Sequence, residues 1–522
     1  MMKSKVRNLQ PAAQKAKLQI YAGSNKQDAG QTELIPSQDR SRFSLGGLLL
    51  LGCLILGSIS CQSGQQEADN KELKGQTTLV ENAIPAPVFP ISVSENHRYF
   101  RDSKGEPFFW LGDTGWLLLS KLDQPSIIAY LKDRESKGFN VIQVMVVHDL
   151  DDRNAYGRKA LTNRTLSLPD TAVSDVLNYW QLLDFVVEEA AKRNIVVALV
   201  PVWGSVVKSG KVTQADAAAY ARFLANRYHG QKNIVWLNGG DIKGSEARPI
   251  WETIGKIIHG QDPSQLMTFH PRGRTQSSTW FHDAPWLDFN CFQSGHRRYD
   301  QDTSKGELHY GEDNYRYVNV DYNKKPVKPT LDAEPSYEGI PQGLHDTLQP
   351  KWNAAAIRRY AYWSVFAGAS GFTYGANSVM QFHDGKDKQS GAYGARKDWH
   401  QALQDTAAGQ IKYLKQLLYS RPYFERIPDS SLIKDQGRRY NYIAATRGDN
   451  YLLCYTFNGR DFTVQLAAFK GAKFRVKWYS PRNGSITEPK ESVFDNKTGF
   501  FHADPPGETV QGNDWVLVMD KI

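Results

Sequence analysis

The sequence contains few cysteines and none of the short motifs that hold metals or nucleotides. It has four cysteines in 522 residues, and two of them, Cys53 and Cys61, fall in the N-terminal signal segment described below. The other two, Cys291 and Cys454, lie in segments that we predict to be different domains, which argues against a disulfide framework. Because the chain has no Cys-x-x-Cys, His-Glu-x-x-His or P-loop pattern, we expect no metal and no cofactor.

The chain also lacks a large excess of charge once its first 60 residues are set aside. The formal net charge is +9. Residues 1–60 hold 8 Lys and Arg against 3 Asp and Glu, which leaves 56 against 52 and a net charge of +4 for the rest. So small a charge gives no reason to expect a nucleic-acid partner. Aromatic residues are plentiful, at 12%, which suits the stacking of sugar rings as well as ordinary core packing.

The N-terminus is typical of an export signal. Two arginines precede an apolar run over 45–57, and a short Ser-Ile-Ser stretch then leads to Cys61. This order is typical of a bacterial lipoprotein signal, in which Cys61 becomes the lipidated first residue. A simple signal peptide and a membrane anchor are the alternatives, although the run is short for a membrane span. We expect a lipoprotein signal segment over 1–61 and a flexible tether over 62–87, with the protein exported and attached to a bacterial membrane only through its lipid, at the cell surface or in the periplasm.

From about residue 88 the sequence alternates short apolar runs with amphipathic stretches. Eight runs predict buried parallel strands, which lie over 107–116, 140–148, 195–204, 233–241, 266–273, 287–296, 328–339 and 369–375. Helical patterns lie between them, and a single closing helix is expected over 399–418. Eight strands that alternate with helices predict an α/β fold, a (β/α)₈ TIM barrel over 88–425.

The pattern changes after Pro422 to short alternating runs that are separated by turns. The predicted strands lie over 440–446, 451–457, 461–465, 474–479 and 515–519. They predict a small antiparallel β-sandwich domain over 426–522. The link between the two domains is short and aromatic, so we expect them to share a substantial interface.

Two carboxylates follow predicted strands of the barrel. Asp241 follows the fourth strand in the stretch NIVWLNGGD, and Glu334 follows the seventh. The C-terminal edge of the strands is where a (β/α)₈ barrel carries its catalytic residues. A protonated carboxyl and an ionised carboxylate across a barrel mouth are what glycoside hydrolysis requires. From position alone, two ordinary surface carboxylates are an equally good interpretation.

Further polar and aromatic residues follow nearly every predicted strand. Each alone has a structural interpretation, such as a helix cap or a half-buried histidine, but their shared position favours one substrate cleft with a tryptophan wall. The candidates for substrate binding are Asp113, Trp116, His148, Trp203, Asn238, His270, Gln293, His296, Tyr337 and Tyr374.

Six short motifs occur in a fixed order along this segment. They are GDTGW (112–116), WLNGGD (236–241), FHPRG (269–273), FQSGH (292–296), AEPSYEG (333–339) and GASGFTYG (368–375). In this order they resemble the apiosidase-like glycoside hydrolases, glycoside hydrolase family 140, whose catalytic domain was formerly a domain of unknown function. The C-terminal segment resembles the small β-domain labelled a collagen-binding domain of a collagenase. The resemblance covers about residues 90–520 and implies that Asp241 and Glu334 are the catalytic pair, with action on a polysaccharide side chain such as the apiose of pectin.

We therefore expect a glycoside hydrolase that acts on a polysaccharide or oligosaccharide. For a retaining enzyme with Glu334 as nucleophile and Asp241 as acid/base, the carboxyl groups should lie about 5–5.5 Å apart, whereas ~6.5–9.5 Å would indicate inversion. Burial or the charge of Glu334 should keep Asp241 protonated, and donors from His296, His270 and Tyr374 should keep Glu334 ionised.

The alternative is a surface lipoprotein that binds glycans without catalysis, or that adheres to a matrix through its C-terminal domain. A protease is not indicated, because the chain has neither a zincin motif nor a Gly-x-Ser-x-Gly elbow. The presence of both Asp241 and Glu334 favours the enzyme. The sequence leaves the sugar, its linkage and the oligomeric state open.

Overall fold

The computed structural model describes residues 77–78, 84–303, 305, 307–386 and 391–522. The predicted signal segment and its Cys61 lie outside these residues. No helix among the described residues is long and apolar enough to cross a membrane.

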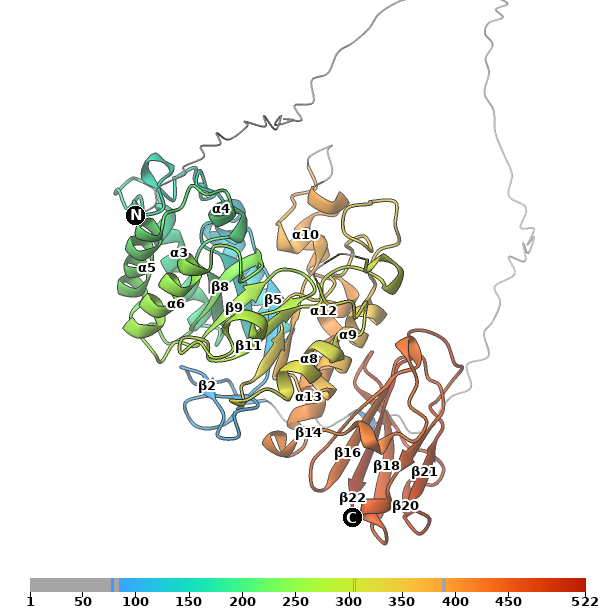
Figure 1. Cartoon of the computed structure of the whole chain (residues 1–522). Coiled ribbons are helices and arrows are strands. Elements are labelled where there is room, and N and C mark those ends of the chain that lie inside the picture. The colour runs from blue at the N-terminus through green and yellow to red at the C-terminus, as the bar shows by residue number, and fades with distance from the viewer. Residues whose placement is uncertain (1–76, 79–83, 304, 306, 387–390) are drawn as a thin grey trace, which may run out of the picture. The chain divides into compact units, whose positions relative to one another are not determined.

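Eight parallel strands form a barrel with helices around it (Figure 1), so the predicted (β/α)₈ barrel is confirmed. Each strand pairs with the next along the chain except the fifth with the sixth, and the last pairs with the first. Between the fifth and sixth strands the Asp288 N–H donates to the Met267 carbonyl at 2.8 Å in place of a regular ladder. The strands are β5 (Trp110–Thr114), β6 (Val141–Met145), β7 (Val196–Val200), β8 (Ile234–Ile242), β9 (Met267–Pro271), β11 (Asn290–Gln293), β12 (Thr330–Asp332) and β13 (Gly371–Tyr374).

The strands are buried along almost their whole length, which explains their continuous apolar sequences. Some of the polar side chains inside the barrel bond to one another. Thr373 Oγ1 accepts hydrogen bonds from Gln143 Nε2 at 3.0 Å and from Trp110 Nε1 at 3.1 Å. A buried polar group whose hydrogen bonds are made costs little, so this layer is compatible with an otherwise apolar core.

Several of the barrel helices begin at a side chain that caps the first turn. Thr213 accepts a hydrogen bond from the Asp216 N–H at 3.1 Å, and Asp216 reaches back to the Thr213 N–H, which makes a capping box. The helices are α1 (Leu118–Lys121), α2 (Gln124–Ser136), α3 (Tyr179–Ala191), α4 (Gly204–Lys208), α5 (Gln214–Tyr228), α6 (Arg248–Gln261), α7 (Ser278–Phe281), α8 (Tyr315–Tyr322), α9 (Ala354–Phe366), α10 (Asn377–Met380), α11 (Trp399–Ala402), α12 (Thr406–Gln410) and α13 (Lys412–Tyr419).

The single closing helix expected over 399–418 is wrong, because three short helices occupy this range. The buried carboxylate of Glu338 accepts hydrogen bonds from the Ala407 N–H at 3.0 and 3.2 Å. This bond satisfies a free N–H group at the start of α12, which a continuous helix would use internally. A side chain 69 residues away in sequence thus sets the break.

Short strands extend the barrel at two places. A three-stranded sheet precedes it, and Phe100 from this sheet packs on Trp110 and Phe289, with ring centroids 6.1 and 5.1 Å apart. An antiparallel strand also pairs with β11. These strands are β2 (Ser92–Val93), β3 (Phe100–Arg101), β4 (Pro107–Phe108) and β10 (Thr275–Gln276).

The C-terminal segment forms two antiparallel sheets that enclose one core, as the sequence predicts. The larger sheet contains β14 (Ile427–Pro428), β15 (Ile443–Arg447), β16 (Tyr451–Thr456), β18 (Lys473–Tyr479), β19 (Ser485–Thr487), β20 (Val493–Asp495) and β22 (Trp515–Lys521), and the smaller contains β17 (Phe462–Gln465) and β21 (Phe500–Ala503). One further strand, β1 (Thr77–Thr78), pairs with β19. The segment predicted as a flexible tether over 62–87 therefore includes two residues that belong to a sheet.

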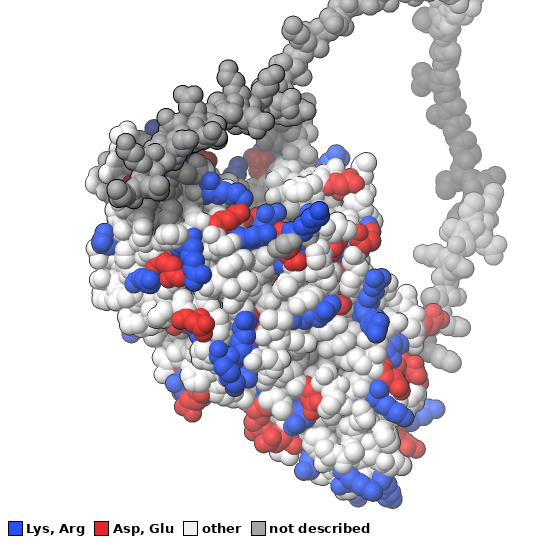
Figure 2. Space-filling view, in the orientation of Figure 1, with Lys and Arg blue, Asp and Glu red and all other residues white. Residues whose placement is uncertain are grey.

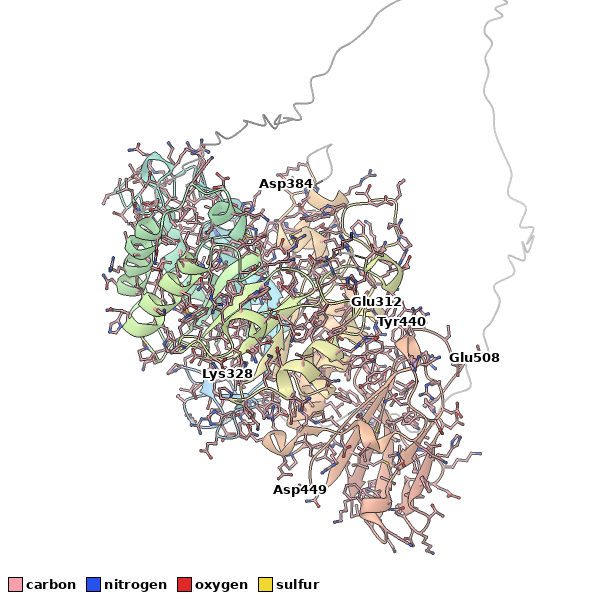
Figure 3. All side chains as sticks on the ribbon, in the orientation of Figure 1. Glu312, Lys328, Asp384, Tyr440, Asp449 and Glu508 are labelled. Atoms are coloured by element: carbon pink, nitrogen blue, oxygen red, sulfur yellow. The ribbon has the colours of Figure 1, made fainter. Side chains whose placement is uncertain are left out.

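Buried polar contacts join the barrel to the C-terminal sheets. Arg358 of α9 pairs with Asp514 through two hydrogen bonds of 2.8 Å, and both side chains are buried. Nearby, Tyr440 Oη donates to Glu312 at 2.8 Å, and Figure 3 labels both residues at this junction. These contacts agree with the substantial interface expected from the short link.

Replacing Asp514 with Ala should destabilise the protein by about 3–5 kcal/mol, because it leaves the Arg358 charge buried without its partner. Urea unfolding followed by tryptophan fluorescence measures the effect. Asp495→Ala is the matched control, because Asp495 is exposed and lies 3.5 Å from the exposed Lys497, so it should change stability by less than about 0.5 kcal/mol. Equal urea midpoints of unfolding for Asp514→Ala and Asp495→Ala would contradict the expected role of the buried Arg358–Asp514 pair.

Candidate active site

Asp241 lies at the end of β8, where the strand leaves its regular path. Gly239 and Gly240 have φ values of +94° and +108°, Asp241 itself has a φ of +47°, and the pairing with β9 shifts register between Gly239 and Ile242. A Cβ atom on Gly240 would lie 2.5 Å from the Trp203 ring, so only glycine fits there. The irregularity is a β-bulge, which re-aims the side chain that follows it. Asp241 consequently faces a cavity at the barrel mouth.

Glu334 lies two residues beyond β12 and is 7% exposed. Two histidines from neighbouring strands contact its carboxylate. His296 Nε2 lies 3.3 Å from Oε1, and His270 Nε2 lies 3.4 Å from Oε2. Both His270 Nε2 and Glu334 Oε2 are buried and form no hydrogen bond to any described residue, so the polar contact of these two atoms is with each other.

The two carboxyl groups have pKa values shifted in opposite directions. The Asp241 side chain is open to the cavity, but the protein around it removes much of its water, and this desolvation, followed by the negative charge of Glu334, raises the pKa of Asp241 to about 7. Burial alone would raise the pKa of Glu334, but the hydrogen bond from His296 and the charge of His270 outweigh it and lower that pKa below its ordinary value. Between the lowered pKa of Glu334 and a pH of about 7, Asp241 therefore mostly holds its proton while Glu334 is ionised.

Aromatic rings form one wall beside these carboxyl groups. The rings of Trp116 and Trp203 lie 5.5 Å apart, and each packs against His270, at 5.4 and 6.1 Å. The Trp116 Nε1–H donates to Tyr337 Oη at 3.1 Å, and the Tyr337 ring packs edge-on to His296 at 4.8 Å. The wall thus provides a stacking surface and also holds both histidines in position.

The cavity has a volume of about 380 Å³, within the size range of small-molecule sites. Loops that follow the barrel strands line it. The lining residues are Trp116, Leu117, Met145, His148, Trp203, Asp241, Arg272, Gly273, Arg274, Gln293, Gly295, His296, Arg297, Glu334, Tyr337, Ile340, Gly343, Leu344, His345, Met380, Gln381, Ala392 and Tyr393.

Most of the residues singled out from the sequence meet in this cavity. Trp116, His148, Trp203, Asp241, Gln293, His296, Glu334 and Tyr337 all line it. His270 is fully buried behind the wall and acts on the cavity through its contact with Glu334.

Besides His270, three of the expected substrate-binding residues do not line the cavity, which corrects the expectation of a shared cleft. Asp113 is fully buried and accepts a hydrogen bond from Tyr130 Oη at 2.7 Å. Asn238 is also fully buried and donates to the Trp251 carbonyl. Tyr374 donates to Glu338 rather than to Glu334, at 2.8 Å. All three lie within their strands and bond to residues outside the cavity, so they support the barrel wall instead.

Several cavity residues were not selected from the sequence. Arg274, Arg297, His345 and Tyr393 lie in loops well beyond the strands, where the alternating pattern gives no signal. Arg272 follows β9 directly in the FHPRG motif, and its position beyond the strand was the only indication.

The site fits acid/base and nucleophilic chemistry. Among the described residues there is no group of three His, Cys, Asp or Glu side chains that could hold a metal ion. The paired carboxyl groups provide an acid and a nucleophile or base in one cavity. A (β/α)₈ barrel with this pair at its mouth defines a glycoside hydrolase.

The comparisons with known proteins agree with this class. A family model described as "Apiosidase-like, catalytic domain" matches residues 94–425, and one described as "Putative collagen-binding domain of a collagenase" matches 427–520. Because the first model covers more than half of the chain, the chain belongs to the apiosidase-like family. The comparison with curated proteins returns no match.

Solved structures give the same result. A structure titled "Glycoside hydrolase" is 42% identical, with a TM-score of 0.79, and the match covers 83% of this chain and 98% of that one. A glycoside hydrolase family 5 structure from Bacteroides vulgatus ATCC 8482 is 41% identical, with a TM-score of 0.79 and coverage of 84% and 95%. A third structure, titled as a putative glycoside hydrolase from the same organism, is 14% identical with a TM-score of 0.60 and 84% coverage of both chains, which shows likeness of fold alone.

The opposite pKa shifts should give a bell-shaped pH profile of kcat/KM. Activity needs Asp241 protonated and Glu334 ionised, so it should fall above a pH of about 7, where Asp241 loses its proton. It should fall on the acid side only below the ordinary carboxyl range, because the pKa of Glu334 is lowered. Initial rates between pH 3 and 9 measure both limbs.

The control for this profile is Asp241→Asn, measured on an aryl glycoside that needs no proton at its leaving group. That variant should lose the basic limb and keep the acid limb. A basic limb that persists in Asp241→Asn would assign the raised pKa to another group.

Proposed function

We propose that this chain is a retaining glycosidase that removes a sugar from the side chain of a pectin-like polysaccharide. The observation that carries the proposal is the pair of opposite pKa shifts within one cavity, raised for Asp241 and lowered for Glu334. Such a pair has one carboxyl ready to donate a proton and another ready to attack at the same pH.

The mechanism proceeds in two steps. In the first, Glu334 attacks the anomeric carbon, the glycosidic bond breaks, and Asp241 passes its proton to the departing oxygen. In the second, Asp241 takes a proton from water, the resulting hydroxide attacks the anomeric carbon, and Glu334 is released. His296 and His270 stabilise the carboxylate before attack and again when it leaves, since both contact it.

The choice of an acidic polysaccharide rests on the family description and on three arginines at the cavity. Arg272, Arg274 and Arg297 line the cavity, where Arg272 lies 3.5 Å from Glu307 and Arg274 lies 3.3 Å from Asp302. Over the face in Figure 2, basic and acidic side chains are interspersed. Guanidinium groups bind carboxylates through paired hydrogen bonds, so arginines beside the aromatic wall favour a sugar linked to a carboxylate-bearing unit such as a uronic acid.

The catalytic roles are tested with two isosteric variants. Glu334→Gln should lower kcat on every substrate at least about 1,000-fold, because the nucleophile is lost. Asp241→Asn should slow release from the natural polysaccharide about 100- to 10,000-fold and an activated aryl glycoside far less, because only the natural leaving group needs protonation. A screen of sugars released from pectic, arabinan and other polysaccharides supplies the substrate.

Proton NMR of the first-formed product reports the stereochemistry in the same samples, and retention is expected. Gln293→Ala serves as a comparison, because this cavity residue carries no charge and should slow both kinds of substrate to a similar degree. Inversion, or equal slowing of both substrates in Asp241→Asn, would contradict the assigned roles.

We also propose that the enzyme is exported and anchored through lipid on Cys61, on the basis of the basic flank, apolar run and cysteine in the sequence. Expression of Cys61→Ala in a bacterium should move the protein out of the membrane fraction or block its maturation. Metabolic labelling with a fatty acid measures the attachment directly, and label that persists in Cys61→Ala would refute the anchor.

A further inference from the structure

A tyrosine in the loop between α10 and α11 points into the cavity and has no role in the mechanism above. Tyr393 lines the cavity from a glycine-containing stretch, 19 residues beyond the end of β13. Its ring lies 5.8 Å from that of His345, which comes from the loop after β12. The two rings therefore extend from neighbouring loops over the same space.

Buried side chains hold the backbone on both sides of this tyrosine. Gln381 donates to the Ala392 carbonyl at 3.0 Å and accepts from the Ala392 N–H at 2.8 Å, as a strand partner would. Asn377 donates to the carbonyl of Tyr393 itself at 3.0 Å. Gln381 and Asn377 are both buried, so the peptide groups around Tyr393 have a fixed position relative to α10.

The backbone of Tyr393 is held in an unfavourable conformation. Its φ of +54° lies in the left-handed region, which residues other than glycine adopt uncommonly. Three other non-glycine residues of the cavity lining, Asp241, Arg274 and Leu344, also have positive φ. Strained backbone of this kind persists where the surrounding structure aims a side chain for function.

The hydroxyl of Tyr393 is free to bind a ligand. It makes no hydrogen bond to any described residue, although the main-chain groups on both sides are bonded. Partial burial and the negative charges of Glu334 and Asp241 raise the pKa of this phenol, so it keeps its proton and acts as a donor. Both carboxyl groups thus lie close enough to influence the hydroxyl, yet neither is bonded to it.

We propose that Tyr393 contacts the substrate, donating a hydrogen bond to the sugar that occupies the space between Glu334 and Asp241. The inference rests on the proposed glycosidase function and extends it by one residue. Gln381 is a positioning residue, because it touches the loop and not the cavity's reacting groups. A donor in the same cavity as the nucleophile can strengthen its bond to a sugar hydroxyl as charge develops at the anomeric centre.

The test is Tyr393→Phe, which removes one oxygen and leaves the ring, assayed on the 4-nitrophenyl glycoside of the sugar that the wild-type enzyme releases from pectin. We expect kcat to fall about 10- to 100-fold with KM changed by less than about threefold, because the lost bond is strongest in the transition state. Tyr156→Phe is the matched control, because the Tyr156 hydroxyl bonds only to Gln124 and does not line the cavity, so it should leave kcat and KM unchanged.

Gln381→Ala separates positioning from contact. Gln381→Ala alone should lower kcat. In the Tyr393→Phe background it should lower kcat by less than a further factor of about two, because Gln381 affects kcat by positioning the Tyr393 hydroxyl, which that background lacks. Circular dichroism of each variant confirms that the fold is retained.

The outcomes distinguish this inference from the proposed function. A rise in KM alone in Tyr393→Phe also supports contact and places the bond in the ground-state complex. In another outcome, the wild-type enzyme is active while the kcat and KM of Tyr393→Phe both stay within about twofold of the wild-type values. That result would overturn the assignment of Tyr393 and leave the glycosidase function intact. A wild-type enzyme that releases no sugar from any polysaccharide in the screen would refute the proposed function, and the inference with it.

Discussion

The site depends on keeping a carboxylate ionised in a buried position. Removing the charge of Glu334 from water costs several kcal/mol unless partners replace the lost hydration. His270 and His296 provide those partners, and aromatic rings hold both in place, Trp116 against His270 and Tyr337 against His296. The barrel is needed for this arrangement, because only parallel strands bring their carboxyl ends, and hence these side chains, to one edge.

The second carboxyl takes its character from the first. Asp241 lies in the same cavity as an ionised Glu334, and repulsion between the charges adds to desolvation by the surrounding protein in favouring its protonated form. The bulge at Gly239 and Gly240 directs Asp241 into this cavity. The bulge needs glycine at position 240, because a side chain there would collide with Trp203. The bulge in β8 thus puts Asp241 in the same cavity as Glu334, where one carboxyl can act as the acid and the other as the nucleophile.

The sequence predicted the barrel, the C-terminal sheets and the residues around the two carboxyl groups, because buried parallel strands leave continuous apolar runs. It failed where position along a strand does not decide side-chain direction. Asp113 and Tyr374 follow the rule for strand ends, yet Tyr130 and Glu338 hold them away from the cavity. Tyr393 was missed for the opposite reason, since its loop has no periodicity and its placement depends on Gln381.

The distribution of strain bears on whether the cavity catalyses or only binds. A binding site needs complementary shape and polarity, which a relaxed barrel mouth can supply with ordinary loop conformations. This cavity instead holds Asp241, Arg274, Leu344 and Tyr393 in left-handed backbone conformations, at a cost of about 1–3 kcal/mol each. It also maintains one protonated and one ionised carboxyl, although two neutral hydrogen-bonding groups would hold a sugar at lower desolvation cost. Both features are explained if the side chains must be aimed at a reacting bond, and neither is required of a protein that only holds glycan.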